Sequence, residues 1–260
     1  MRFLFLLLLA ASVAQQPETM SLIKEPLYPP PVSRDERAHL EDEIAQARGD
    51  VARDPSNVAA YLRLAQAERG LGHVGDALET LTRAIEGKAD APALHLERGR
   101  GFLDIRKFDL AQKDFRKAVD TLPEAHCDIA FSLYLLADYK QSHDEYGRCK
   151  DPGVFGYLAA RRAGAPAGAK PALPEDAASR RGTVTFPGAA PSTPRTRESS
   201  IYAIYIDAVD RLIAGDKKGA RDLLKPIVEK QKDRWMEPIY IAAEADYARV
   251  YKPERKRKKK

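Results

Sequence analysis

The sequence predicts an all-α protein built as an α-solenoid of stacked helical hairpins. The first observation is an internal repeat, in which a spaced triplet returns 34 residues later: Ala77, Leu81 and Ala84 recur as Ala111, Phe115 and Ala118. Each triplet steps by four residues and then three, so it lies on one face of a helix. The second observation is that similar helical spacing continues on both sides of a proline-rich segment, residues 163–198. A fixed period of this length is typical of stacked helical hairpins.

The first 14 residues, MRFLFLLLLAASVA, are predicted to be a secretory signal peptide. Arg2 supplies a positive start, Phe3–Ala11 is an unbroken apolar run, and Ser12–Ala14 is a small-x-small cleavage site. The alternative is a membrane anchor, but Phe3 to Ala14 is too short to cross about 30 Å of hydrocarbon at about 1.5 Å per residue. We therefore expect a periplasmic or secreted mature chain without a transmembrane span.

The elements that follow begin with an arm at residues 15–33, which contains Pro17, Pro26 and the run Pro29–Pro31. This composition favours an extended, polyproline-like arm over packed structure. A helix is expected from Arg34, with its apolar face marked by Leu40, Ile44, Ala47 and Val51. The Asp54–Asn57 stretch ends this helix and offers a cap for the next.

Three helical hairpins and a short further helix are predicted next, and together with the first helix they form an array over residues 34–162. The hairpins run over Asn57–Gly87, Pro92–Leu122 and Glu124–Cys149, with breaks at Gly70–Gly72, near Ile105–Lys107 and at Ala137–Asp138, and the short helix covers Pro152–Arg162.

The hairpin residues resemble the tetratricopeptide repeat (TPR) family, whose signature is W-x2-L-G-x2-Y, then A-x3-F, then P. The second hairpin fits this signature best, through Gly99, Phe102, Ala111, Phe115, Ala118 and Pro123. The first offers Tyr61, Leu64, Ala65, Ala77, Leu81 and Ala84, and the third is divergent, with His126, Ile129, Ala130, Leu133, Ser142, Tyr146 and Cys149. The resemblance covers roughly residues 38–150 and is specific for fold, not for ligand.

The resemblance also implies a binding groove, because ligands of this family usually lie along the inner faces of the first helix of each hairpin. Carried onto this chain, the groove contains Leu62, Gln66, Arg69, Leu96, Arg100, Leu103, Cys127, Phe131 and Tyr134. Such a mixed apolar surface suits a protein or peptide partner. The alternative for each residue is that it packs on a neighbouring helix. A carboxylate-gripping role is excluded because Glu97, Glu124 and Asp128 would repel that ligand.

Residues 163–198 hold six prolines and four glycines and are predicted to be a flexible linker, with at most a brief extended piece at Thr183–Phe186. A C-terminal helical segment follows at residues 199–251, comprising a hairpin broken at Gly215-Asp216 and a capping helix from about Trp235 to Tyr251. Tyr240, Tyr247, Tyr251 and Met236 share one face of that helix. This stripe is either core or an exposed contact surface.

The two cysteines lie near the start and the end of the third hairpin. An antiparallel hairpin brings those ends together, so a disulfide between Cys127 and Cys149 is sterically possible; two buried thiols are the alternative. A metal site with His126 and His143 is disfavoured, because the chain has no CxxC or HExxH spacing.

The formal charge of +5 comes from the last nine residues, which carry +6: Lys252, Arg255, Lys256, Arg257, Lys258, Lys259 and Lys260, with one acid, Glu254. Without this tail and Arg2, the body carries −2. Such a run can bind an anionic polymer or lipid, and a solvated end is the alternative. The signal peptide argues against nuclear import and specific nucleic-acid binding.

No catalytic residues and no cofactor site are predicted, since the chain lacks a phosphate-binding loop, a GxSxG motif and a nucleophile–base arrangement. The leading hypothesis is an exported, non-catalytic adaptor that binds a protein in the repeat groove. The second is an envelope tether that binds an anionic polymer or lipid through its tail. A third, a hydrolase formed at the linker, has no residues to support it.

Overall fold

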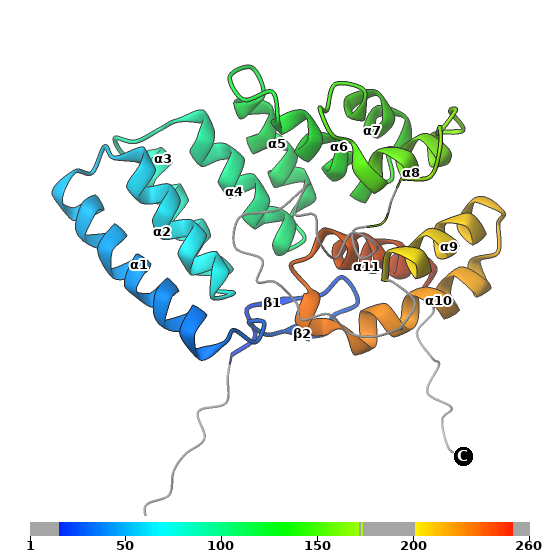
Figure 1. Cartoon of the computed structure of the whole chain (residues 1–260), viewed down its shortest axis with the longest axis horizontal. Coiled ribbons are helices and arrows are strands. Elements are labelled where there is room, and N and C mark those ends of the chain that lie inside the picture. The colour runs from blue at the N-terminus through cyan, green and yellow to red at the C-terminus, as the bar shows by residue number, and fades with distance from the viewer. Residues whose placement is uncertain (1–15, 172, 174–200, 252–260) are drawn as a thin grey trace, which may run out of the picture.

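The computed structural model describes residues 16–171, 173 and 201–251 (Figure 1). Its elements, in order, are β1 (Thr19–Met20), β2 (Pro26–Leu27), α1 (Arg34–Arg53), α2 (Val58–Gly70), α3 (Val74–Glu86), α4 (Pro92–Asp104), α5 (Phe108–Ala118), α6 (Ala125–Leu135), α7 (Tyr139–Tyr146), α8 (Gly153–Ala163), α9 (Ile201–Ile213), α10 (Lys217–Lys230), a 3-10 turn η1 (Lys232–Arg234) and α11 (Pro238–Val250). The fold class predicted from the sequence, an all-α solenoid of helical hairpins, is confirmed. The predicted signal peptide, the piece at Thr183–Phe186 and the basic tail lie outside the described residues.

Helices α1 to α8 form an arc in which each helix packs on its neighbours in sequence (Figure 1). The C-terminal helices α9, α10 and α11 lie on the inner side of this arc, where α11 contacts α6. Among the described helices, none combines the length with the apolar character that crossing a bilayer requires.

The same turn closes four helical hairpins. In each, one residue takes a left-handed backbone conformation, namely Gly72, Arg106, Ala137 and Gly215. The following amide then donates to the carbonyl five residues back, as from His73 to Glu68 and from Asp216 to Arg211. This is the Schellman arrangement that ends many helices. Its presence between α9 and α10 shows that the C-terminal hairpin is locally built like those of the array.

Within the second hairpin, a glycine allows the two helices to approach closely. A Cβ atom built on Gly99 of α4 would lie 2.4 Å from Cε1 of Phe115 on α5. The small side chains Ala65, Ala77 and Ala111 are likewise buried. The periodic small and large positions of the sequence therefore mark the contacts between paired helices.

The N-terminal segment differs from the extended, unpacked arm that its proline content predicted. Residues 16–33 include the antiparallel pair β1–β2, with Thr19 opposite Leu27, and Leu27 is buried in the main core. Cα of Pro29 and Cδ of Pro30 lie so close to Gly72 that a Cβ there would meet them at 2.9 and 2.6 Å. The segment packs because residues far along the chain supply its apolar partners.

The C-terminal segment shares one hydrophobic core with the array. That core contains Phe115 and Phe131 of the array, Tyr205 of α9 and Trp235 and Tyr240 near and in α11. Leu173, inside the predicted linker, also belongs to it. The inner side of the arc is therefore occupied by the chain itself at α6, which α11 contacts, and at α8, which α9 contacts.

Candidate protein-binding face

The predicted groove residues divide into two groups. Leu62 and Gln66 of α2 and Arg100 of α4 are partly exposed. The others that project from α2, α4 and α6 are buried: Arg69, Leu96, Leu103, Phe131 and Tyr134. At these five positions the expectation of an open groove is wrong, and the packing alternative describes them. Cys127, also expected on this face, is half-buried.

A hydrogen-bonded network attaches α9 and α11 to the third hairpin. The hydroxyls of Tyr134 and Tyr205 lie 3.0 Å apart, and Tyr205 donates to Asp246 at 2.7 Å. Arg162 of α8 donates to Asp246 at 2.9 Å, and its guanidinium lies 4.5 Å from the centre of the Tyr139 ring. The network fills the position where a ligand of the third hairpin would lie.

A buried cluster of charges lies further along the inner face. Arg69 donates to Asp104 at 2.5 Å and to Glu97 at 3.3 Å. Arg100 pairs with Asp128 at 3.2 Å. Burial raises the pKa of the Asp104 and Asp128 carboxyls, and the guanidinium groups of Arg69 and Arg100 oppose this shift. Each arginine of the cluster therefore forms ion pairs with buried carboxylates, and these pairs fix the positions of the arginine side chains.

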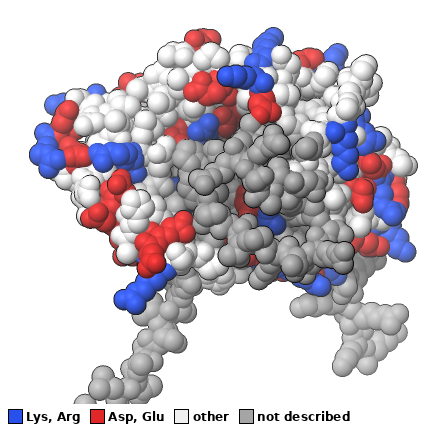
Figure 2. Space-filling view, viewed as in Figure 1, with Lys and Arg blue, Asp and Glu red and all other residues white. Residues whose placement is uncertain are grey.

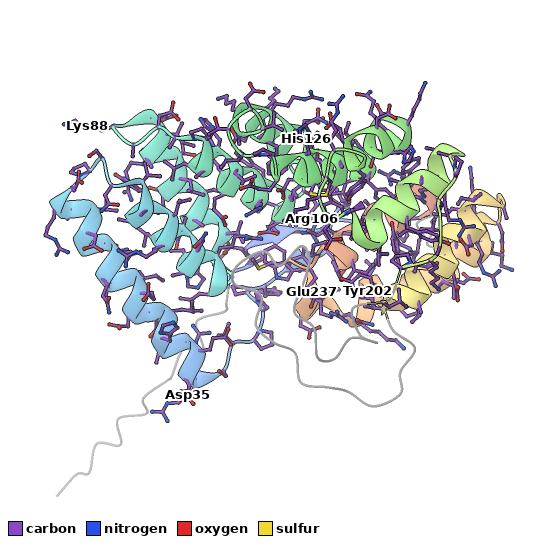
Figure 3. The ribbon with its side chains drawn as sticks, turned by 45° about the horizontal axis from the view of Figure 1, so that its top comes forward. Asp35, Lys88, Arg106, His126, Tyr202 and Glu237 are labelled. Atoms are coloured by element: carbon purple, nitrogen blue, oxygen red, sulfur yellow. A yellow bond between two sulfur atoms is a disulfide. The ribbon has the colours of Figure 1, made fainter. Side chains whose placement is uncertain are left out.

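Arg106 and Glu244 join the array, the C-terminal helices and the N-terminal segment. The guanidinium lies 2.6 Å from Oε2 of Glu244, and both side chains are buried. Oε1 of Glu244 accepts from the amide of Leu22 at 2.7 Å. The Arg106 guanidinium also lies 5.6 Å from the centre of the Trp235 ring. Figure 3 shows Arg106 in the interior of the molecule, between the array and the C-terminal helices.

Four residues of these networks were not predicted from the sequence: Arg106, Arg162, Glu244 and Asp246. The signal that could have found the two acids is α11 itself, where Glu244 and Asp246 interrupt a helix that is otherwise apolar or aromatic on all sides as far as Arg249 in its last turn. A helix of that kind is buried, and buried carboxylates need partners. No comparable signal singles out Arg106 and Arg162 among the many arginines of the chain.

Cys127 and Cys149 are joined by a disulfide, with their Cα atoms 5.0 Å apart. The neighbouring His126 directs Nδ1 at Oε2 of Glu145, at 2.7 Å. Within the part of the chain that the structure describes, no three His, Cys, Asp or Glu side chains gather as metal ligands. The bridge ties the start of α6 to the residues after α7.

The tyrosine stripe of α11 is mostly core. Tyr240 and Tyr247 are buried, Met236 is half-buried, and Tyr251 at the helix end is exposed. Tyr240 and Tyr247 are therefore part of the core, and only Tyr251 lies on an exposed surface.

A shallow groove of about 580 Å³ lies outside the arc between α1 and α3. Its floor contains Glu68, whose Oε1 accepts from Arg48 at 3.1 Å and whose Oε2 accepts from Thr80 at 2.9 Å. Val51, Ala52, Pro55, Tyr61 and Leu64 supply its apolar lining. No sequence motif indicates this groove, because α1 lies outside the three hairpins that resemble the repeat signature.

The buried tyrosines predict that the fold loses stability in alkali. Burial raises the pKa of Tyr134, Tyr146 and Tyr205 above the ordinary value of 10.0. The folded state holds these phenol protons more tightly than the unfolded state does. The free energy of unfolding therefore has its full value below pH 10, and it falls as the pH rises through the higher pKa values of the folded state. We expect the urea midpoint to fall above about pH 10, and to fall less steeply in Tyr134→Phe. An equally steep fall in that variant would contradict the assignment to Tyr134.

Comparison with known proteins adds a partial match. No family model matches the chain. Over 84 residues, 32% of this chain, it is 38% identical to DnaJ homolog subfamily C member 3 of Bos taurus, and 37% identical to the proteins of that name from Homo sapiens and Mus musculus. The chain spans only 17% of the length of these relatives. The partial match and the helical hairpins together fit a TPR-type repeat family.

Proposed function

We propose that this protein is an exported, non-catalytic scaffold that binds a protein partner on the N-terminal half of its repeat array. The observation that carries the proposal is the uneven filling of the inner face. The side chains from the third hairpin, Phe131 and Tyr134, are buried beneath the chain's own C-terminal helices. Leu62 and Gln66, one turn apart on α2, remain partly exposed. A partner can therefore contact α2 without displacing any part of the core.

The chemistry of this face suits a peptide segment with both apolar and polar side chains. Leu62 offers an apolar contact, Gln66 offers an amide that both donates and accepts hydrogen bonds, and Arg100 adds a guanidinium whose charge Asp128 and Glu97 balance. Because Arg100 is already fixed by Asp128 and Glu97, its position needs little ordering on binding. The scaffold would act by holding its partner in place.

Export is part of the same proposal, with localisation to a periplasm or the extracellular space. Two features support it: the signal-peptide pattern of residues 1–14 and the disulfide between Cys127 and Cys149, since disulfides persist in oxidising compartments. Cell fractionation with N-terminal sequencing tests it, and a cytosolic chain that still begins at Met1 would contradict it.

The binding surface is tested by affinity capture from the cell envelope with the chain from residue 15. The double variant Leu62→Glu and Gln66→Glu should reduce capture of the specific partner by roughly tenfold or more, because it places two charges in an interface centre. The matched control is Val51→Glu and Ala52→Glu in the outer groove, which should leave capture unchanged. Loss of capture in the control alone would move the partner to the outer groove and overturn the inner-face site. Equal capture by all forms would contradict both surfaces.

A further inference from the structure

We propose that residues 16–30, here called the strap, are a detachable intramolecular ligand that covers a peptide-binding surface between the first hairpin and the C-terminal helices. The strap contains the β1–β2 pair, which lies between the array and η1 (Figure 1). It contacts the turn between α2 and α3 on one side, and η1 and α11 on the other. Because the strap precedes α1 in the chain, its release need not unfold any helix.

Two side chains of the folded body bind the strap through its main chain. Oε1 of Glu244 accepts from the amide of Leu22 at 2.7 Å, and this carboxylate is itself buried. Nε1 of Trp235 donates to the carbonyl of Tyr28 at 2.7 Å. Main-chain amides and carbonyls are common to all peptides, so these two bonds do not depend on the side chains of the strap. The pair therefore recognises a peptide backbone of this shape.

The side chains of the strap add an apolar anchor and two acidic contacts. Leu27 is 1% exposed and belongs to the main core. The Glu18 carboxylate accepts from the amide of Gly75 in the first turn of α3, a helix whose N-cap residue provides no side-chain bond. A carboxylate oxygen of Glu25 lies 2.7 Å from Nζ of Lys232. A ligand for this surface is therefore a short acidic peptide with one apolar side chain that becomes buried.

Short-range contacts, rather than a field of one sign, select this ligand. Figure 2 shows acidic and basic side chains intermixed over the described part of the array surface. Opposite charges that lie close together largely cancel beyond a Debye length. Recognition therefore depends on the groups that touch the strap, which are Glu244, Trp235, Lys232 and the amide of Gly75.

The strap is attached less firmly than the helix that it contacts. Within the strap only Ser21 and Leu27 are buried, whereas α11 buries every residue from Ile239 to Tyr247. A segment with few buried contacts opens locally at a smaller free-energy cost than the whole fold. The strap can therefore be exchanged for a peptide from solution while the helices stay folded.

The experiment measures binding of a fluorescent peptide with the sequence of residues 16–30 to the chain from residue 15, by fluorescence anisotropy. The unaltered chain should bind this peptide weakly, because its own strap competes at a high effective concentration. The substitution Leu27→Asp in the chain removes the apolar anchor of the strap and leaves the surface beneath it unaltered. We expect this variant to bind the peptide roughly a hundredfold more tightly than the unaltered chain does.

The matched control places the same charge outside the strap, by Leu110→Asp at a position of α5 that is 41% exposed, and should bind the peptide as weakly as the unaltered chain. Trp235→Phe added to Leu27→Asp should weaken binding about fivefold, because the indole donor is lost. A peptide with aspartate in place of Leu27 should not bind. Equal affinity in the Leu110→Asp and Leu27→Asp chains would overturn the proposal, as would absence of peptide binding to Leu27→Asp.

Hydrogen exchange in the unaltered chain tests the strap without any substitution. The amide of Leu22 should exchange at least roughly tenfold faster than the buried amides of α11, because the strap opens by itself. Equal rates would show that the strap opens only with the whole fold and would overturn the proposal. A dimer of the unaltered chain that Leu27→Asp converts to a monomer would also overturn it, because the strap would then bind a second copy. The Leu62 and Gln66 substitutions that test the scaffold lie outside this surface and should not change peptide binding.

Discussion

Replacing Glu244 by alanine is expected to lower the free energy of unfolding by about 3–5 kcal/mol, because the change leaves the Arg106 guanidinium buried without its charge partner. The loss also removes the acceptor for the amide of Leu22. Chemical denaturation in urea, followed by far-UV circular dichroism, measures the change. Because Glu244 joins three parts of the chain, the N-terminal segment and the C-terminal helices should both become more accessible to proteases.

A matched control for this experiment is Glu237→Ala. Glu237 pairs with Arg234 at 2.6 Å, but both side chains are partly exposed, so the expected loss is only about 0–1 kcal/mol. A second comparison replaces Arg106 by methionine and Glu244 by leucine together, which should recover most of the stability, since apolar pairs often substitute well for buried ion pairs. A loss below about 1 kcal/mol in Glu244→Ala would show that the pair is not a stabilising link.

Replacing Trp235 by alanine is expected to cost about 3–5 kcal/mol, through the cavity left by a large side chain that is 0% exposed. The change also removes the hydrogen bond from Nε1 to the carbonyl of Tyr28, at 2.7 Å. That bond holds residues 16–33 against the turn before α11. We therefore expect the N-terminal segment to detach first, measured as early proteolytic cleavage within residues 16–33.

Trp235→Phe separates the two contributions. Phenylalanine keeps most of the apolar contact and loses only the donor, so the expected cost from the hydrogen bond is about 1 kcal/mol, plus a smaller cavity than alanine leaves. The exposed Tyr251→Ala is a further control and should change stability little. Equal losses in Trp235→Ala and Tyr251→Ala would contradict the central packing position of Trp235.

Much of the fold could be predicted from the sequence because its determinants are local. The repeated spacing of Ala77, Leu81 and Ala84 sets helix faces, and the breaks at Gly70–Gly72 and Ala137–Asp138 coincide with observed turns. Helix periodicity and chain reversal each depend on residues within a few positions of one another. The candidate site was less predictable, because exposure of an inner-face residue depends on what else covers it. Phe131 and Tyr134 have the spacing of groove residues and are buried nonetheless.

The helical hairpins, their pairing and the residues that make their contacts follow from side-chain periodicity along one stretch of chain, so the sequence was enough to predict them. The partial closure of the inner face, by contrast, depends on contacts between distant parts of the chain and is visible only in the folded molecule. Residues 16–33 have too little apolar surface to order themselves. They pack because they contact Trp235 and Glu244, which lie more than 200 positions away in the sequence. Such long-range contacts carry no local signal, because their stabilisation arises only when distant apolar surfaces and charges are buried together.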